Sequence, residues 1–269
     1  MDQTPYNPRD VPSKTWDQRG AKTVTAKQMK VGVGHVSVLL TVCADGTKLP
    51  PLIVFKAKAG GRVEAEFTKP DFPKDGIYCA VQDNAWCDER IMLMWVDKVL
   101  KPYIATCPHG VIPYLLLDKY KCHSTAAVVR EIEQLGVEWD ILPGGCTGLI
   151  QPIDVGIGKP FKNRLCSKWE DWVVENFDID DSTGEITETE RIKPNSCRKL
   201  VAQWALESWN CISKEHVYNS WRHGTFSYFP GEPTVQCVFN EDPEECIDDD
   251  DDDTNSNDTD TEDSDGEQV

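Results

Sequence analysis

The sequence lacks the features of a membrane or secreted protein. No apolar run among its 269 residues approaches the roughly 20 that a membrane helix needs. Residues 1–10 are polar and contain two prolines, unlike the apolar core of a secretory leader. Apolar residues still make up 39% of the chain, enough for the core of one large domain or two small ones. We therefore expect a globular protein without a membrane segment.

Spaced cysteine pairs and a phosphate-binding loop are also missing. The eleven cysteines include no C-x₂-C pair and no pair followed by H-x₃₋₅-H, which disfavours a zinc finger. Their odd number and scatter disfavour a disulfide framework and favour reduced thiols in the cytosol or nucleus. The Gly-rich loop 143–148 lacks the G-x-x-x-x-G-K-[ST] pattern, so nucleoside triphosphate binding is not supported.

Basic residues are absent from the last part of the chain. Residues 241–269 contain 16 Asp or Glu and no Lys or Arg, which leaves 30 acidic against 28 basic residues in 1–240. The net charge of −18 thus belongs mainly to a tail that is nearly free of apolar residues and is expected to be disordered. The rest of the chain can still meet nucleic acid through a local basic surface.

The hydrophobic pattern predicts an α/β fold. An Asp-Gly turn joins two apolar runs into a hairpin, and an apolar run, a helical stretch and a second apolar run form a parallel crossover unit. We expect Pro102 to end a helix capped by Asp88, and the run Tyr114–Leu117 to be buried on both faces. The strands are predicted at 36–43, 49–55, 77–81, 114–117 and 137–142, and the helices at 88–101, 124–135, from 154 onward, 196–209 and 213–221.

Three carboxylates stand out by their positions. Asp118 ends an apolar strand, Asp154 follows the Gly-rich loop at a helix start, and Asp2 lies at the beginning of the chain. Such carboxylates can hold Mg²⁺ or Mn²⁺, and two such ions roughly 4 Å apart assist phosphodiester displacement. The alternative is chance among 46 acidic residues, since an Asp near a helix start is also a good cap.

Five motifs in series resemble the DDE-type transposase domain of the pogo/Tigger group, over roughly residues 1–225. The motifs are Met1-Asp-Gln-Thr-Pro5, Lys14-Thr-Trp-Asp-Gln-Arg-Gly-Ala-Lys22, Ala44-Asp-Gly-Thr-Lys-Leu-Pro-Pro51, Leu115-Leu-Leu-Asp118 with His123 five residues on, and Leu149-Ile-Gln-Pro-Ile-Asp-Val-Gly-Ile-Gly-Lys-Pro-Phe-Lys162. The resemblance implies a ribonuclease-H-like mixed sheet flanked by helices, and divalent-metal-dependent cleavage and strand transfer of DNA in the nucleus. It also implies that Asp2, Asp118 and Asp154 are the catalytic carboxylates, with 35 residues between the last two.

The resemblance defines the predicted domain boundaries and also shows where this sequence departs from the family. We predict a catalytic domain over 1–177, a C-terminal helical extension over 178–240 and the acidic tail over 241–269. The helix-turn-helix module that precedes the family's catalytic domain is not seen here, and most of the first strand is expected to be missing, which would place Asp2 on a frayed end. Besides an active enzyme, the sequence therefore allows a non-catalytic DNA- or chromatin-binding protein derived from a transposase, or an inactive relic.

Several further residues are candidates near the site. Lys159, Lys162 and Arg164 follow Asp154 and could contact DNA phosphates, the alternative being a solvated helix face. The basic stretch 9–30 could also line DNA, and the acidic tail could bind basic chromatin proteins. A thiol nucleophile at Cys122 beside His123 is rejected, because adjacent side chains are expected to point apart and no third group is evident.

Overall fold

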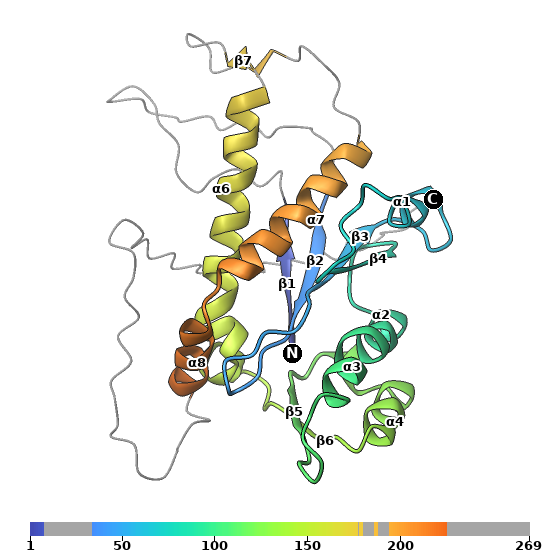
Figure 1. The fold of residues 1–269 in the computed structure, drawn as a ribbon, viewed down its shortest axis with the longest axis vertical. Coiled ribbons are helices and arrows are strands. Elements are labelled where there is room, and N and C mark those ends of the chain that lie inside the picture. The colour runs from blue at the N-terminus through green and yellow to red at the C-terminus, as the bar shows by residue number, and fades with distance from the viewer. Residues whose placement is uncertain (8–33, 177, 180–185, 188–193, 225–269) are drawn as a thin grey trace, which may run out of the picture. The chain divides into compact units, whose positions relative to one another are not determined.

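The computed structural model describes residues 1–7, 34–176, 178–179, 186–187 and 194–224 (Figure 1). The predicted basic stretch 9–30 and the acidic tail 241–269 lie outside these residues. Within the described part of the chain, no helix is both long and apolar enough to cross a membrane.

The central element is a mixed β-sheet. Four strands follow the order β1-β2-β3-β4, in which β1 and β2 and then β2 and β3 pair antiparallel, while β3 and β4 pair parallel. Two further strands, β5 and β6, pair parallel with each other and are joined by helix α4, as the crossover pattern predicted. The strands are β1 Asp2–Tyr6, β2 Val36–Leu40, β3 Leu52–Lys56, β4 Tyr78–Gln82, β5 Tyr114–Leu117 and β6 Glu138–Ile141, with the short pair β7 Asp178–Ile179 and β8 Ile186–Thr187.

Helices flank this sheet, so the fold is α/β and consistent with the expected ribonuclease-H-like class (Figure 1). They include two π-helical segments, η1 and η3, and one 3₁₀ turn, η2. Their bounds are α1 Arg62–Glu66, α2 Glu89–Trp95, η1 Val96–Leu100, α3 Lys101–Ile104, η2 Lys121–Ser124, α4 Ala126–Gln134, α5 Thr147–Ile150, η3 Ile153–Ile157, α6 Gly158–Asn176, α7 Pro194–Cys211 and α8 Lys214–His223.

Both faces of the inner strands are buried, because successive side chains of a strand point to opposite faces. In β3, Ile53 and Phe55 enter a core shared with α6, α7 and α8. Leu52 and Val54 of the same strand enter a second core, shared with α2, η1 and α4. The sheet region is therefore a middle layer whose two faces are covered by different helices.

Strand β1 contradicts the expectation that Asp2 would lie on a frayed end, whereas the expectation that part of this strand is missing stays a prediction. Asp2 opens a five-residue strand and is only 4% exposed, because the strand runs onward from Asp2 to Tyr6 beside β2. The amino group of Met1 donates a hydrogen bond of 3.1 Å to the carbonyl oxygen of Leu116 in β5. Asp2 is thus held between two strands and does not lie on a frayed end.

Two local predictions were wrong. Pro102 does not end the helix: Asp88 caps it as predicted, by accepting from the Ile91 amide at 2.9 Å, but the helix continues through η1 into α3. Pro102 lies in the first turn of α3, where its missing N–H costs little, and the π-helical turn before it shifts the hydrogen-bond register. Strand β5 is not buried on both faces, because Tyr114 is exposed and Leu116 only half-buried.

Helices α7 and α8 share the first core with the sheet. Trp204 and Trp209 of α7 and Val217 of α8 are buried in the same cluster as β2 and β3. The described residues all belong to one compact unit. The boundary predicted between residues 177 and 178 stays a prediction.

Candidate active site of three carboxylates

Three different elements bring the predicted carboxylates to one place. Asp2 is the first residue of β1, Asp118 directly follows β5, and Asp154 is the second residue of η3. Asp2 is buried, Asp118 is half-buried and Asp154 is largely exposed. The cluster thus extends from the buried start of β1 to the protein surface at Asp154.

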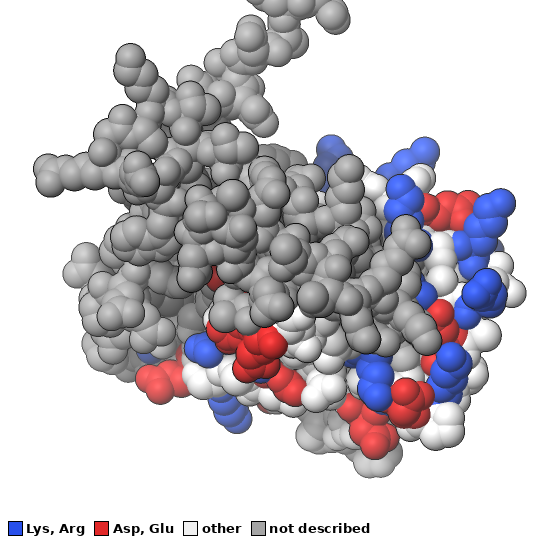
Figure 2. Space-filling model, turned by 90° about the horizontal axis from the view of Figure 1, so that it is seen from above, with Lys and Arg blue, Asp and Glu red and all other residues white. Residues whose placement is uncertain are grey.

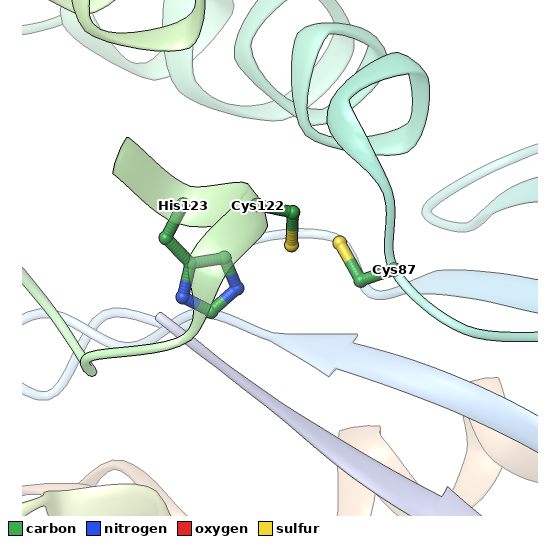
Figure 3. Close-up of side chains that lie close together, drawn as sticks. All are labelled: Cys87, Cys122 and His123. Carbon is green, nitrogen blue, oxygen red and sulfur yellow. The ribbon is translucent and has the colours of Figure 1, made fainter. Parts of the chain in front are cut away.

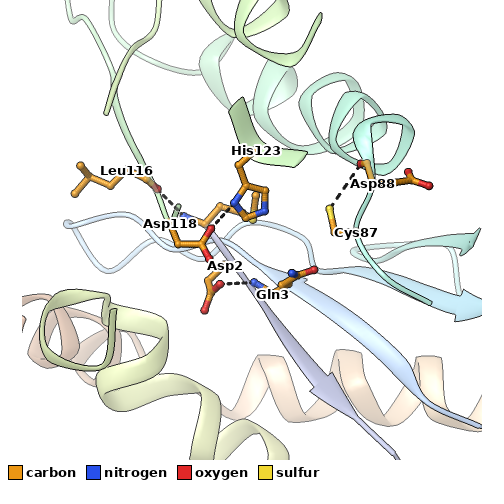
Figure 4. Close-up of polar contacts among 8 residues, drawn as sticks. Asp2, Gln3, Cys87, Asp88, Leu116, Asp118 and His123 are labelled. Carbon is orange, nitrogen blue, oxygen red and sulfur yellow. Dashed lines mark hydrogen bonds and ion pairs between the residues drawn. The ribbon is translucent and has the colours of Figure 1, made fainter. Parts of the chain in front are cut away.

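The pKa of the Asp2 carboxyl shows how closely the three groups interact. Burial raises this pKa, and the negative charges of Asp154 and Asp118 raise it further, to about 7. The amide of Gln3 donates to Asp2 Oδ1 at 2.7 Å and partly offsets the rise (Figure 4). Near neutral pH, Asp2 is therefore poised between its protonated and ionised forms.

Asp154 belongs to the same electrostatic cluster. Partial desolvation raises its pKa, and the charge of Asp118 adds to that effect. A hydrogen bond with the Asp2 carboxyl and the nearby charge of Lys162 act in the opposite direction. The three carboxyl groups repel one another when all are ionised, which is the situation that a bound cation would relieve.

His123 holds Asp118 from the protein side. The Nδ1 atom of His123 and the Oδ1 atom of Asp118 form a close ion pair, which Figure 4 draws between the end of β5 and η2. Burial disfavours a charged imidazole, but the contact with Asp118 outweighs it and raises the pKa of His123 to about 9. One oxygen of Asp118 is thus engaged by His123, which fixes the orientation of the carboxylate.

Two cysteines lie next to this histidine, and the sequence pattern did not connect them. Cys87 precedes α2 and Cys122 precedes His123 in η2, and the ligand atoms of the three side chains lie within 4.8 Å of one another. A hydrogen bond from Cys87 lowers the pKa of Cys122 to about 6, against burial and with the help of His123. Cys122 and His123 therefore do not point apart as expected, because a tight 3₁₀ turn carries them.

The predicted DNA-contacting residues all lie on α6. Lys159 and Arg164 are exposed, whereas Lys162 is half-buried and close enough to Asp154 to lower its pKa. At roughly 100° per residue, Arg164 points about 160° away from Lys162 around the helix. In the view of Figure 2, basic and acidic side chains are interspersed over the described surface. Lys162 is therefore the basic residue that the fold associates most directly with the carboxylates.

A separate cavity of about 820 Å³ is lined in part by Met1. Its lining is mostly apolar and includes Leu115 and Leu116 together with residues that follow β2 and residues from α3. None of the three aspartates lines it. The carboxylate cluster is thus distinct from this cavity.

Comparison with known proteins gives a consistent family assignment. Residues 34–221 match the family model described as "DDE superfamily endonuclease", a range that contains Asp118 and Asp154 but not Asp2. The chain is similar to "Pogo transposable element with KRAB domain" of Mus musculus, with 27% identity over 216 residues, which are 79% of this chain and 33% of the relative. The human protein of the same name is 26% identical over 79% of this chain and 32% of its own length. The human "Pogo transposable element with ZNF domain" is 29% identical over 55% of this chain and 10% of its own length. This chain thus spans about a third of the length of the first two relatives.

Proposed function

This chain belongs to the DDE superfamily endonuclease family and is a pogo-type, transposase-derived domain, and from that premise we propose that Asp2, Asp118 and Asp154 bind divalent metal ions and cleave DNA phosphodiester bonds. The convergence of these three carboxyl groups carries the proposal, together with the pKa of Asp2, which its two partners help to raise to about 7. Within the described residues, three interacting carboxylates with a single ion pair among them, that of Asp118 with His123, repel one another without a cation and suit hard ions with oxygen ligands.

The donor set fits Mg²⁺ or Mn²⁺. All three candidate ligands are carboxylates, and both ions prefer oxygen over sulfur or imidazole ligands. When bound, two such ions would activate a water or a 3′-hydroxyl and stabilise the leaving oxygen of the scissile phosphodiester. The chain's own contribution is to hold the carboxylates: His123 orients Asp118, and the Gln3 amide orients Asp2.

We further propose that α6 positions the DNA backbone. Lys162 lies near Asp154, and Lys159 and Arg164 are exposed on the same helix. Positive side chains on such a helix neutralise phosphates and contribute to affinity without reading sequence. Action on DNA implies a nuclear location, and the acidic tail 241–269 would contact basic chromatin proteins.

Thermal unfolding with and without Mn²⁺ tests the metal site. The parent chain is compared with Asp118→Asn and Asp154→Asn, and with Asp83→Asn as a control that removes an exposed carboxylate from a turn. Mn²⁺ should raise the melting temperature of the parent and of Asp83→Asn, and should leave the two site variants unchanged, because a ligand stabilises only the state that binds it.

A DNA cleavage assay on the same four proteins then separates the two functional hypotheses. Mn²⁺-dependent nicking by the parent and by Asp83→Asn, lost in both site variants, supports the endonuclease. DNA binding that persists in all four proteins without nicking supports the non-catalytic alternative. A melting temperature that is indifferent to Mn²⁺ in the parent contradicts the metal site itself.

A further inference from the structure

A buried cluster of two thiols and an imidazole lies behind the carboxylate site. Cys87 comes from the segment that leads into α2, and Cys122 and His123 come from η2, as Figure 3 shows. Their exposed fractions are 4%, 8% and 0%, so the cluster is closed to bulk solvent. Residues 35 positions apart in the sequence thus meet in a small space between two helical elements.

The imidazole is oriented toward the two sulfur atoms. Its Nδ1 atom faces Asp118, while the second ring nitrogen, Nε2, lies on the side of the cysteines (Figures 3 and 4). Within the described part of the chain, the fully buried Nε2 makes no hydrogen bond of normal geometry, and the Cys122 sulfur is the group with which it interacts. An unsatisfied buried nitrogen is costly, and a bound cation would satisfy it.

We propose that Cys87, Cys122 and His123 form a binding site for a thiophilic d¹⁰ metal ion, Zn²⁺ or Cu⁺. Thiolate sulfur and imidazole nitrogen are the ligands that these ions prefer, whereas Mg²⁺ and Mn²⁺ prefer oxygen. The contact between Nδ1 and the Asp118 carboxylate matches the usual outer partner of a metal-binding histidine. The three ligands do not include Asp2, Asp118 or Asp154, so metal binding by the cluster is measured without a DNA cleavage assay, although His123 contacts Asp118.

Binding requires a defined transfer of protons. Near neutral pH Cys122 is largely ionised already and His123 is protonated on both ring nitrogens. Binding therefore releases the proton of the Cys87 thiol and the Nε2 proton of His123 to solvent, while Nδ1 keeps its proton for Asp118. Two thiolates and Zn²⁺ then sum to zero charge, whereas two thiolates and Cu⁺ leave one negative charge. In either case the ion links η2 to the start of α2 and fixes the histidine that orients Asp118.

Titration with Co²⁺, as a coloured substitute for Zn²⁺, tests the site on the reduced protein. The titration uses a background variant in which Ser replaces four cysteines. Two of them, Cys166 and Cys211, are exposed, and the other two, Cys237 and Cys246, lie outside the described residues. We expect one equivalent of Co²⁺ to produce thiolate-to-cobalt absorption that one equivalent of Zn²⁺ abolishes. An excess of Mg²⁺ should not affect it. A parallel titration with Cu⁺ and a competing chelator decides which of the two ions binds more tightly.

Substitutions assign the ligands. Cys87→Ser and Cys122→Ser should each reduce Co²⁺ affinity by at least tenfold, whereas Cys197→Ser, which removes a buried thiol from the other core, should not change it. Because a cluster variant can fail to fold, X-ray absorption on the Zn²⁺-loaded background protein provides a second measurement. Two sulfur neighbours at about 2.3 Å and at least one nitrogen neighbour would support the site.

Three results would overturn the proposal. One is uptake of less than one equivalent without thiolate absorption. Another is a metal environment of oxygen and nitrogen alone. The third is an equal rate of Cys87–Cys122 disulfide formation by hydrogen peroxide with and without Zn²⁺. A bound metal ion should protect both thiolates and slow this oxidation.

Discussion

Replacing Asp2 by Asn is expected to stabilise the metal-free protein at pH 8 and to change its stability little at pH 4. Asp2 is buried and adjoins the charges of Asp154 and Asp118, so its pKa is about 7 in the folded protein. In the unfolded chain the ordinary value of 3.8 applies. Folding at pH 8 therefore forces an ionised carboxylate into a site that favours the neutral acid, and Asn removes that cost.

The size and the pH range of the effect follow from these two values. The folded state binds the Asp2 proton more tightly, so this group's contribution to stability is present at low pH and is lost as the pH rises from about 4 to about 7. At about 1.4 kcal/mol for each pH unit of that interval, the upper limit is about 4 kcal/mol. His123, whose pKa is raised to about 9, loses its contribution between about pH 6.5 and 9. That loss is common to parent and variant and cancels in their difference.

Urea unfolding at pH 4, 6 and 8 in the presence of a chelator measures the effect. The difference in unfolding free energy between Asp2→Asn and the parent should grow with pH and level off above about pH 8. Asp83→Asn, which changes an exposed carboxylate, should show no such trend. A difference that is the same at pH 4 and pH 8, or a destabilised Asp2→Asn protein at pH 8, would refute the clustered arrangement of the carboxylates.

Two further predictions concern the frame that supports the site. Gly46→Ala should lower the free energy of unfolding in urea by more than about 1 kcal/mol, because Gly46 has a φ of +84° and an added Cβ would lie 2.8 Å from a carbonyl oxygen of α8. Gly110 has a φ of +85° but open space around it, so Gly110→Ala should lower that free energy only by the backbone strain of about 1 kcal/mol. Arg198→Met should lower the free energy of unfolding by roughly 3 kcal/mol, because Arg198 donates two hydrogen bonds of 2.8 Å to the Glu66 carboxylate, which would be left largely buried and unpaired. Lys199→Met, which breaks an exposed ion pair, should lower it by less than about 1 kcal/mol. Equal losses in both variants would contradict the reasoning.

Local patterns in the sequence were sufficient for most of the elements. The Asp-Gly turn predicted the hairpin of β2 and β3, and the spacing of apolar residues predicted α4 and α6, because these signals depend on neighbours along the chain. Pro102 was misjudged, since a π-helical turn before a proline has no clear sequence signal. The exposure of Tyr114 was misjudged as well, because an apolar strand does not show which of its faces is covered.

The candidate site was likewise predicted in part by the sequence and decided in part by the tertiary structure. The sequence by itself determined which residues are candidates for metal binding, because the positions of Asp2, Asp118 and Asp154 and the resemblance to the family's motifs were sufficient to select them. Only the tertiary structure decided that β1 runs onward from Asp2 and buries it beside β5, so that the three carboxyl groups interact. Only the tertiary structure placed Cys87 against Cys122, because that contact depends on how α2 packs on η2 and leaves no periodic signal in the chain. Side-chain chemistry is a local property of the sequence, whereas burial, charge coupling and long-range contacts are properties of the packed fold.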